Sequence, residues 1–166
     1  MAATISGIST LGIVLSYGIE TTAGVKPATF TVLDRINAIS GIELSTETID
    51  SSALEDLQER SIAGRQSTGG EWTFTINATN ETIPQVETMM SASATAKAAG
   101  KRTWFQVYSP DLTKAWFVVA QPGSKVPMPD FSQNELLTCD ISLTVDEYIG
   151  IDTKIPASGA ANATTE

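Results

Sequence analysis

The amino-acid sequence predicts a mainly β (α+β) fold, with antiparallel β-sandwich or barrel-forming sheets, one flanking α-helix, a long inter-strand loop and an N-terminal arm. Three observations support this prediction. The chain contains 22 Thr and 16 Ser but only 17% charged residues, and Thr favours strands. Apolar and polar residues alternate in several segments, as they do in half-buried strands. A length of 166 residues corresponds to one compact domain.

The first part of the chain is predicted to contain an arm, a strand and a loop. Residues 1–28 show no sustained period of 2 or 3.6, so we expect an N-terminal arm that orders against another surface. Alternation runs from Phe30 to Leu44, which predicts one long strand with a bulge near Leu33–Asp34. Between residues 46 and 70 the alternation is lost and charges are dense, so we expect a long loop.

A strand and the single helix follow the loop. In residues 71–77 three large apolar side chains alternate with polar ones, which predicts a strand with one buried face. Thr82 is the expected N-cap of the helix, and Gln85, three residues on, completes a capping box. Gly100 is expected to end the helix.

The last part of the chain is predicted to form a hairpin and a long strand. The hairpin comprises residues 103–109 and 114–120, and the final strand covers residues 136–148. Residues 152–166 are small and polar and are expected to be a flexible tail. The predicted organisation is therefore an arm over 1–28, a β domain over 29–151, and this tail.

The amino-acid composition excludes most kinds of catalytic site. Histidine is absent, which removes imidazole bases and the commonest transition-metal ligand. The single cysteine, Cys139, lies on the apolar face of the final strand, so we expect a buried thiol with no reactive role. The glycines of residues 64–70 have the spacing of a phosphate-binding loop, but Gly70 stands where Lys is required. We expect no catalytic residue, no cofactor, no metal site and no enzyme activity.

Charge and hydropathy limit the classes of partner that the protein is expected to bind. The chain has 10 basic and 19 acidic residues and a net charge of −9, which disfavours tight binding to nucleic-acid phosphates. The apolar run at residues 11–15 is too short to cross a bilayer and no Lys or Arg precedes it. We therefore expect no membrane partner.

One long segment resembles a known family. Residues 24–83 read GVKPATFTVLDRINAISGIELSTETIDSSALEDLQERSIAGRQSTGGEWTFTINATNETI. This run resembles the opening half of the major tail tube proteins of long-tailed, non-contractile bacteriophages (siphophages). The expected order of elements over residues 20–150 is similar too: strand, charged loop, strand, helix, hairpin and long final strand.

The resemblance implies a structural role in a virion. Proteins of this family form hexameric rings that stack into a tail tube, whose β-barrel lumen conducts DNA to the host during ejection. Expected partners are other copies of the chain, a tape measure protein, a tail terminator, and passing double-stranded DNA that is not held tightly. The expected location is the virion tail, assembled in the host cytoplasm. The arm and the 46–70 loop are the expected contacts between rings.

Two sets of residues are candidates for these roles. Polar side chains that alternate with a clear apolar face are candidates for the lumen side, the alternative being that they face outer solvent. These are Thr138, Asp140, Ser142 and Thr144, and Glu71, Thr73, Thr75 and Asn77. Charged residues of the loop are candidates for contacts between rings, with ordering only on ring stacking; a solvated loop is the alternative. These are Glu47, Asp50, Glu55, Asp56, Glu59, Arg60 and Arg65.

Other functions remain as alternatives. The tube protein of a contractile injection or secretion system has a similar expected architecture. A monomeric β-sandwich binding or capsid decoration module is the alternative from another class, although the six large aromatic residues of the predicted strands lie in strand interiors rather than on an exposed platform. A carboxylate-only hydrolase is the weakest alternative.

Overall fold

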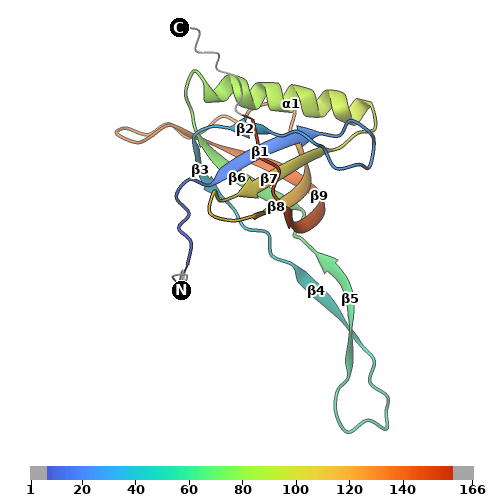
Figure 1. The fold of residues 1–166 in the computed structure, drawn as a ribbon. Coiled ribbons are helices and arrows are strands. Elements are labelled where there is room, and N and C mark those ends of the chain that lie inside the picture. Colours follow the sequence, from blue (N-terminus) through green and yellow to red (C-terminus); the bar gives the residue numbers. More distant parts are fainter. Residues whose placement is uncertain (1–6, 159–166) are drawn as a thin grey trace, which may run out of the picture.

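The computed structural model describes residues 7–158, which form nine strands and one helix (Figure 1). The mainly β fold with one helix is confirmed. Seven strands make one antiparallel sheet in the order β2-β1-β7-β8-β9-β6-β3, and β4 and β5 form a separate two-stranded sheet. The elements are β1 (Val14–Ile19), β2 (Thr31–Leu33), β3 (Ile36–Ile39), β4 (Ser45–Asp50), β5 (Ser61–Ser67), β6 (Glu71–Asn77), α1 (Thr82–Ala98), β7 (Thr103–Tyr108), β8 (Lys114–Pro122) and β9 (Thr138–Thr153).

The large sheet is rolled so that its two edges approach each other. β2 is one edge strand and β3 is the other, yet only Asp34 and Arg35 separate them in the chain. Arg35 has a φ of 55° and its carbonyl accepts a hydrogen bond from Asn77 N at 2.9 Å. No ladder joins β2 to β3 among the described strands, so the sheet is not a closed barrel.

This arrangement corrects the expectation of one long strand from Phe30 to Leu44. Side chains alternate in the same way whether these residues form one strand or two. The alternation therefore does not show that the neighbouring strand changes from β1 to β6. The change of partner strand at Asp34–Arg35 does not reverse the chain and involves neither Gly nor Pro, so the sequence contains no turn signal there.

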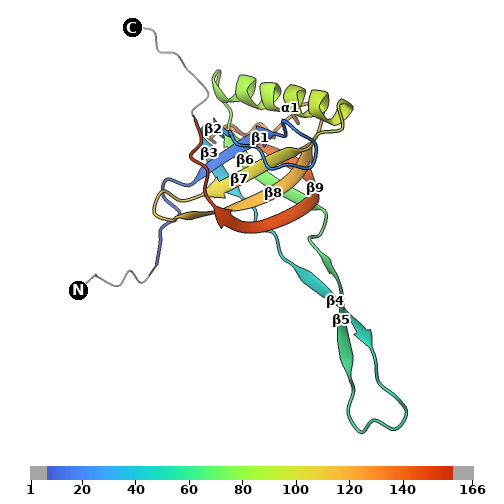
Figure 2. The same ribbon diagram turned by 45° about the vertical axis from the view of Figure 1, so that its right-hand side comes forward.

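The main core fills the inside of the rolled sheet, and α1 packs along it (Figure 2). Trp72, Phe74 and Ile76 of β6 are buried there. The Trp72 ring lies 5.6 Å from that of Phe105 of β7, between centroids. Met89 of α1 is also fully buried in this cluster. The expected apolar faces of β6 and β9 are confirmed, and β9 extends further than expected, to Thr153.

A second, smaller core lies on the outer face of β7 and β8. Its members are Phe30, Trp104, Ala115, Phe117 and Val119. Two segments cover it: the chain between β1 and β2, and residues 154–158, whose last residue forms a bridge with Thr31. The ring of Phe30 contacts that of Phe117 edge-on, with centroids 5.9 Å apart.

The second core corrects two expectations about the chain ends. Within residues 1–28, Val14–Ile19 form β1, an interior strand paired with both β2 and β7. Within residues 152–166, the first residues complete β9 and cover the second core, while residues 159–166 lie outside the described part. Short strands that mix Gly and Ser with apolar residues show little periodicity, which is why β1 was missed.

The helix begins differently from the prediction and ends as predicted. Its N-cap is Glu81, without a side-chain capping bond. Thr82 is instead buried, and its hydroxyl donates to Asn77 O at 2.6 Å. The amide of Gln85 pairs with Asp34 rather than closing a capping box. Gly100 has a φ of 75°, and the backbone bonds Lys101 N to Ala96 O and Gly100 N to Lys97 O close a Schellman motif.

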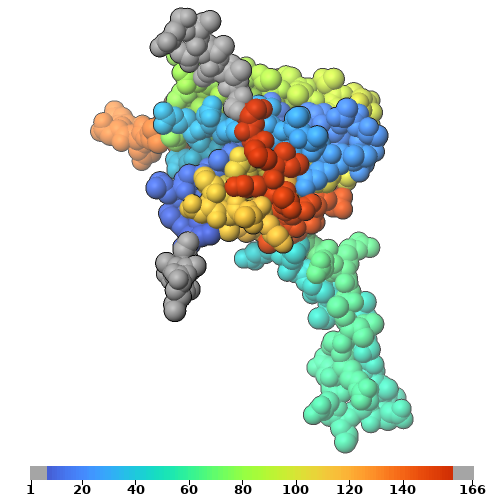
Figure 3. Space-filling model, viewed as in Figure 1, coloured from blue at the N-terminus to red at the C-terminus, as the bar shows by residue number. Residues whose placement is uncertain are grey.

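Residues 45–67 form a hairpin that projects from the body, where a long loop was expected (Figure 3). β4 and β5 pair with each other and with no other described strand. Every residue of β4 and all but one of β5 are exposed. Polar and charged residues on both faces hid the strand pattern, because no face is buried. No described helix is long and apolar enough to cross a membrane.

Candidate functional site

The eight candidate lumen residues form one continuous polar ladder on the open face of β6 and β9. Every residue of one set lies directly opposite a residue of the other. The cross-strand pairs are Glu71 with Thr144, Thr73 with Ser142, Thr75 with Asp140, and Asn77 with Thr138. We call this surface the polar ladder. Its place opposite the main core follows from the alternation of both strands.

Side-chain hydrogen bonds join the two strands within two of the cross-strand pairs of the polar ladder. Thr75 Oγ1 donates to Asp140 Oδ1 at 2.6 Å, and Thr73 Oγ1 lies 3.3 Å from Ser142 Oγ. Asp140 and Ser142 are exposed. The ladder is thus a strip of five hydroxyls, two carboxylates and one carboxamide, exposed or half-exposed along its length, with no cationic side chain among its eight residues.

The outer face of the sheet is divided into a covered half and an uncovered half. Over β1, β7 and β8 the second core and its covering segments exclude solvent, and even Ser16 and Gln106 are buried there. Gln106 Nε2 donates to Ile155 O at 2.7 Å, which holds the C-terminal cover in place. Over β9 and β6 the outer face carries the polar ladder. The fold therefore presents one polar strip of sheet to its surroundings.

The second candidate surface is the hairpin. All seven charged residues predicted for contacts between rings lie on it. Glu47 and Asp50 belong to β4, Arg65 belongs to β5, and Glu55, Asp56, Glu59 and Arg60 lie in or beside the tip. The structure brings them onto one projecting element about which the sequence predicted only a loop.

The tip of the hairpin is shaped by its own polar side chains. Asp56 Oδ2 accepts a hydrogen bond from Ala53 N at 2.8 Å, and Asp56 pairs with Arg60 at 3.5 Å. Ser52 Oγ accepts from Arg60 N at 2.8 Å. Hydrogen bonds from the Ser52 side chain and backbone lower the pKa of the Asp50 carboxyl. The tip is therefore an ordered turn rather than a random coil.

Apolar side chains are also exposed on the hairpin. Leu54 and Leu57 at the tip are as accessible as in an extended chain, at 110% and 102%. Ile49 and Ile62, a cross-strand pair, are about half exposed. A two-stranded hairpin is marginally stable by itself, and one with free edges and bare leucines is typical of an element that packs against another chain.

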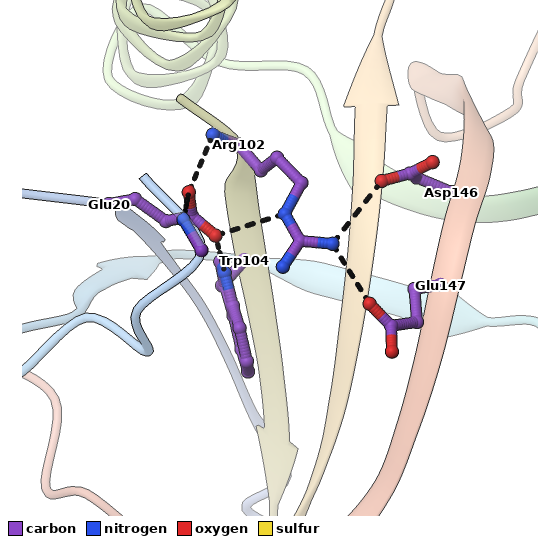
Figure 4. A network of polar contacts seen from close by, with 6 residues as sticks. Glu20, Arg102, Trp104, Asp146 and Glu147 are labelled. Carbon is purple, nitrogen blue, oxygen red and sulfur yellow. Dashed lines mark hydrogen bonds and ion pairs between the residues drawn. The ribbon is translucent and has the colours of Figure 1, made fainter. Parts of the chain in front are cut away.

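A buried charge network, which the sequence did not reveal, joins three parts of the fold (Figure 4). Glu20, just after β1, has no exposed side-chain surface. Its carboxylate accepts hydrogen bonds from Trp104 Nε1 at 2.7 Å, Arg102 Nε at 3.0 Å, Arg102 N at 3.1 Å and Gly24 N at 2.9 Å. Arg102 then reaches Glu147 of β9 at 2.8 Å and Asp146 at 3.5 Å.

The network perturbs the pKa values of its members. Burial acts to raise the pKa of the Glu20 carboxyl, but the hydrogen bonds from Trp104, Gly24 and Arg102 outweigh burial and lower it. The bond to Glu147 is the largest cause that raises the pKa of Arg102. Both groups are therefore charged, and the network is an ion pair that connects the loop after β1 to β7 and β9.

The remaining features of this kind in residues 7–158 include a buried thiol and a surface cavity. Burial raises the pKa of the Cys139 thiol. Among residues 7–158, no group of three or more His, Cys, Asp or Glu is arranged to hold a metal ion. A cavity of about 380 Å³ lies at the C-terminal end of α1, between Lys97, Lys101 and the middle of β8 and β9.

Comparison with known proteins identifies the fold. No family model and no curated protein matches the sequence. One solved structure that is similar is a chain in the six-fold symmetrised cryo-EM structure of the anti-feeding prophage (AFP) baseplate. It has a TM-score of 0.58 and 9% identity, over 91% of this chain and 97% of that chain.

A second similar structure is a chain in the tail of an empty GTA particle with C6 symmetry. It has a TM-score of 0.55 and 12% identity, over 89% of this chain and 99% of that chain. Both likenesses extend over almost the whole of both chains, so the chain has the fold found in a phage-type baseplate and in a particle tail.

Proposed function

We propose that this protein is a virion structural protein that assembles as stacked hexameric rings into a tail tube. The observation that carries the proposal is the projecting hairpin. It exposes free strand edges and leucines on an element that has no core of its own. An exposed patch of this kind marks a surface for association. Identical subunits joined by one projecting element and a different receiving surface form open stacks.

The likeness in fold supports six-fold symmetry. The two similar chains come from a six-fold symmetrised baseplate and a C6-symmetric tail. The long strands of such a subunit, rolled but unclosed, leave edges that a ring of subunits protects. The tape measure protein and the tail terminator implied by the siphophage resemblance are further proposed partners.

We assign the polar ladder to the lumen of this tube. It is the uncovered half of the outer sheet face, and its residues are hydroxyls and carboxylates. A lining without cations does not bind phosphates in the salt-sensitive manner of DNA-binding proteins. DNA therefore passes through without being held, as ejection requires.

Electron microscopy of the purified chain tests the proposal. Negative staining is expected to show hollow tubes with six-fold end views. A chain that remains monomeric at every concentration contradicts the tube and favours a monomeric binding module. A baseplate-type ring that does not extend would favour an injection-system component, consistent with the AFP likeness.

Removal of the hairpin tests its role separately. Replacing residues 46–66 by Asn-Gly leaves Ser45 and Ser67, which are paired, joined by a favoured two-residue turn. We expect a soluble monomer with the thermal stability of the wild type and no tubes, because β4 and β5 pair with no other described strand. Lys125→Ser, in an exposed loop outside the hairpin, is the control and is expected to assemble. Normal tubes from the shortened chain contradict the role of the hairpin.

A further inference from the structure

We infer that the tip of the hairpin of one copy docks into the cavity at the C-terminal end of α1 of a second copy. In this contact Leu54 and Leu57 enter the cavity, while Glu55 and Glu59 pair with Lys97 and Lys101. The inference rests on the proposed function, since it names the surface that receives the hairpin.

The free charges of the tip are acidic. Of its four charged residues, Asp56 and Arg60 pair with each other. Glu55 and Glu59 are exposed and, among the described residues, have no ion-pair partner. The net charge of residues 51–60 is −2, from three carboxylates and one guanidinium. A surface that is complementary in charge to the tip therefore carries at least two unpaired cations.

The cavity at the end of α1 supplies these cations. Lys97 and Lys101 border it, four residues apart, and neither belongs to an ion pair within residues 7–158. The third cation at the cavity, Arg102, is occupied by Glu20, Glu147 and Asp146. Asp146 is the one carboxylate that lines the cavity, and its pairing with Arg102 leaves the two lysines as the unpaired charges there. Lys97 also lies in the last turn of the helix, where a cation is compatible with the helix dipole.

The floor of the cavity suits a leucine side chain. It is formed by Val119, Ala120 and Val145, which are apolar members of β8 and β9. The volume of about 380 Å³ exceeds what one branched side chain needs, and the rim is polar. A leucine flanked by carboxylates matches an apolar floor flanked by ammonium groups.

The placement of the two surfaces favours a contact that propagates. α1 lies on the opposite side of the body from the hairpin in both ribbon views (Figures 1 and 2). The cavity extends from the end of α1 to Thr144–Asp146 of β9, where Val145 N donates to Gly70 O at 3.0 Å near the foot of the hairpin. Because the tip and the cavity are different surfaces, the contact is heterologous, and it extends into an open stack when the rotation between copies does not close a ring. Another apolar cavity lies between Ile42 and Trp116. It has no charged lining residue, so it offers no cation to pair with Glu55 and Glu59.

One such contact is small, so its strength comes from repetition. A tip of ten residues buries far less surface than a stable protein interface requires. Six copies of the contact between two rings act together, and linked contacts raise the overall affinity without new interactions. The proposal therefore predicts no stable dimer in dilute solution and cooperative assembly above a threshold concentration.

Charge exchange tests the contact. Glu55→Lys with Glu59→Lys, and separately Lys97→Glu with Lys101→Glu, are each expected to reduce tube yield at least about tenfold. The chain that carries all four substitutions is expected to recover tubes, because each pair of charges is restored with opposite sign. Lys114→Glu with Lys125→Glu is the matched control, since these exposed lysines lie elsewhere, and is expected to assemble normally.

Cross-linking gives a second measurement that does not need tubes. Gln58→Cys and Lys101→Cys, carried by separate chains and mixed, are expected to form a disulfide-linked dimer under oxidation; Cys139 is buried and does not compete. Gln58→Cys mixed with Lys125→Cys is expected to remain monomeric. Wild-type tubes together with no recovery by charge exchange and no specific cross-link overturn this contact alone. Absence of wild-type tubes contradicts the proposed function, and the cross-link then decides the contact by itself.

Discussion

At the scale of single residues, Glu20 and Arg102 link three separate parts of the chain. All four donors around Glu20 point at its two oxygens, so the carboxylate acts only as an acceptor. A buried charge is tolerated when it is paired and fully hydrogen-bonded. The network therefore ties the chain leaving β1 to the start of β7 and, across β8, to β9.

The first prediction concerns Glu20→Gln. The amide of glutamine offers one acceptor oxygen, and its NH₂ group would face donors. We expect the free energy of unfolding to fall by about 1–3 kcal/mol, the range for leaving buried donors unsatisfied, since Arg102 keeps Glu147 and Asp146 as partners. Denaturant unfolding measures the change. Asp152→Asn, in the exposed pair with Lys26, is the control and is expected to change stability little. An equal effect of both substitutions would contradict the role of burial.

The second prediction concerns pH. The pKa of Glu20 is lowered in the folded protein, so its contribution to stability is complete above the ordinary glutamate pKa of about 4.3. That contribution is lost as the pH falls through the lower pKa of the folded state. We expect the wild-type free energy of unfolding to fall more steeply on acidification than that of Glu20→Gln. Parallel pH profiles for the two chains would show that Glu20 does not titrate with unfolding.

At the scale of elements, the cover over the second core depends on a glycine in β1. A Cβ at Gly18 would lie 2.7 Å from Thr29 O and 3.2 Å from the Phe30 ring. The missing side chain lets the segment before β2 pass directly over the sheet. Close backbone approach of this kind is one of the reasons for glycine within a strand.

The third prediction follows from this approach. Gly18→Ala is expected to lose about 1–3 kcal/mol of stability, the usual cost of overpacking. The cover over Phe30 and Phe117 is expected to loosen, which faster hydrogen exchange of residues 27–33 would detect. Gly41→Ala is the control, because no atom lies within 4 Å of a Cβ there. Similar stability for both variants would mean that the cover shifts at no cost.

At the scale of the whole molecule, the chain separates its surfaces by chemistry. The inside of the sheet and half of its outside are apolar cores. The remaining sheet face carries the polar ladder, and the hairpin extends away from both. With a net charge of −9 per chain, a ring of six carries −54 (6 × −9). An assembly of this charge repels DNA unless cations gather on one face.

The fourth prediction concerns the ladder within an assembled tube. Glu71→Lys with Asp140→Lys adds two cations to each subunit on the surface assigned to the lumen. We expect tubes that retain double-stranded DNA at low salt and release it steeply as salt rises, measured by co-sedimentation after nuclease treatment of the outside. Glu81→Lys with Glu87→Lys on exposed positions of α1 is the control and is expected to leave no protected DNA. Protection in neither variant would contradict a lumen position for the ladder.

The class of fold and the buried faces of the most regular strands follow from the amino-acid pattern alone. Alternation placed Trp72 and Ile141 inside and Asp140 outside, because a buried face must be apolar over its whole length. The stop at Gly100 was equally readable, since a positive φ there requires glycine. The eight residues of the polar ladder were identified individually from the same alternation.

Which strands are neighbours, and what each surface contacts, does not follow from that pattern. That β2 and β3 lie at opposite edges, that the hairpin is ordered, and that Glu20 is buried beside Arg102 depend on contacts between residues far apart in the chain. Hydrophobic periodicity indicates whether a side chain is buried, but it does not indicate which strand or helix packs against that side chain. The register of β6 against β9 turned two separate polar patterns into one surface, and the cover from both chain ends left that surface alone open.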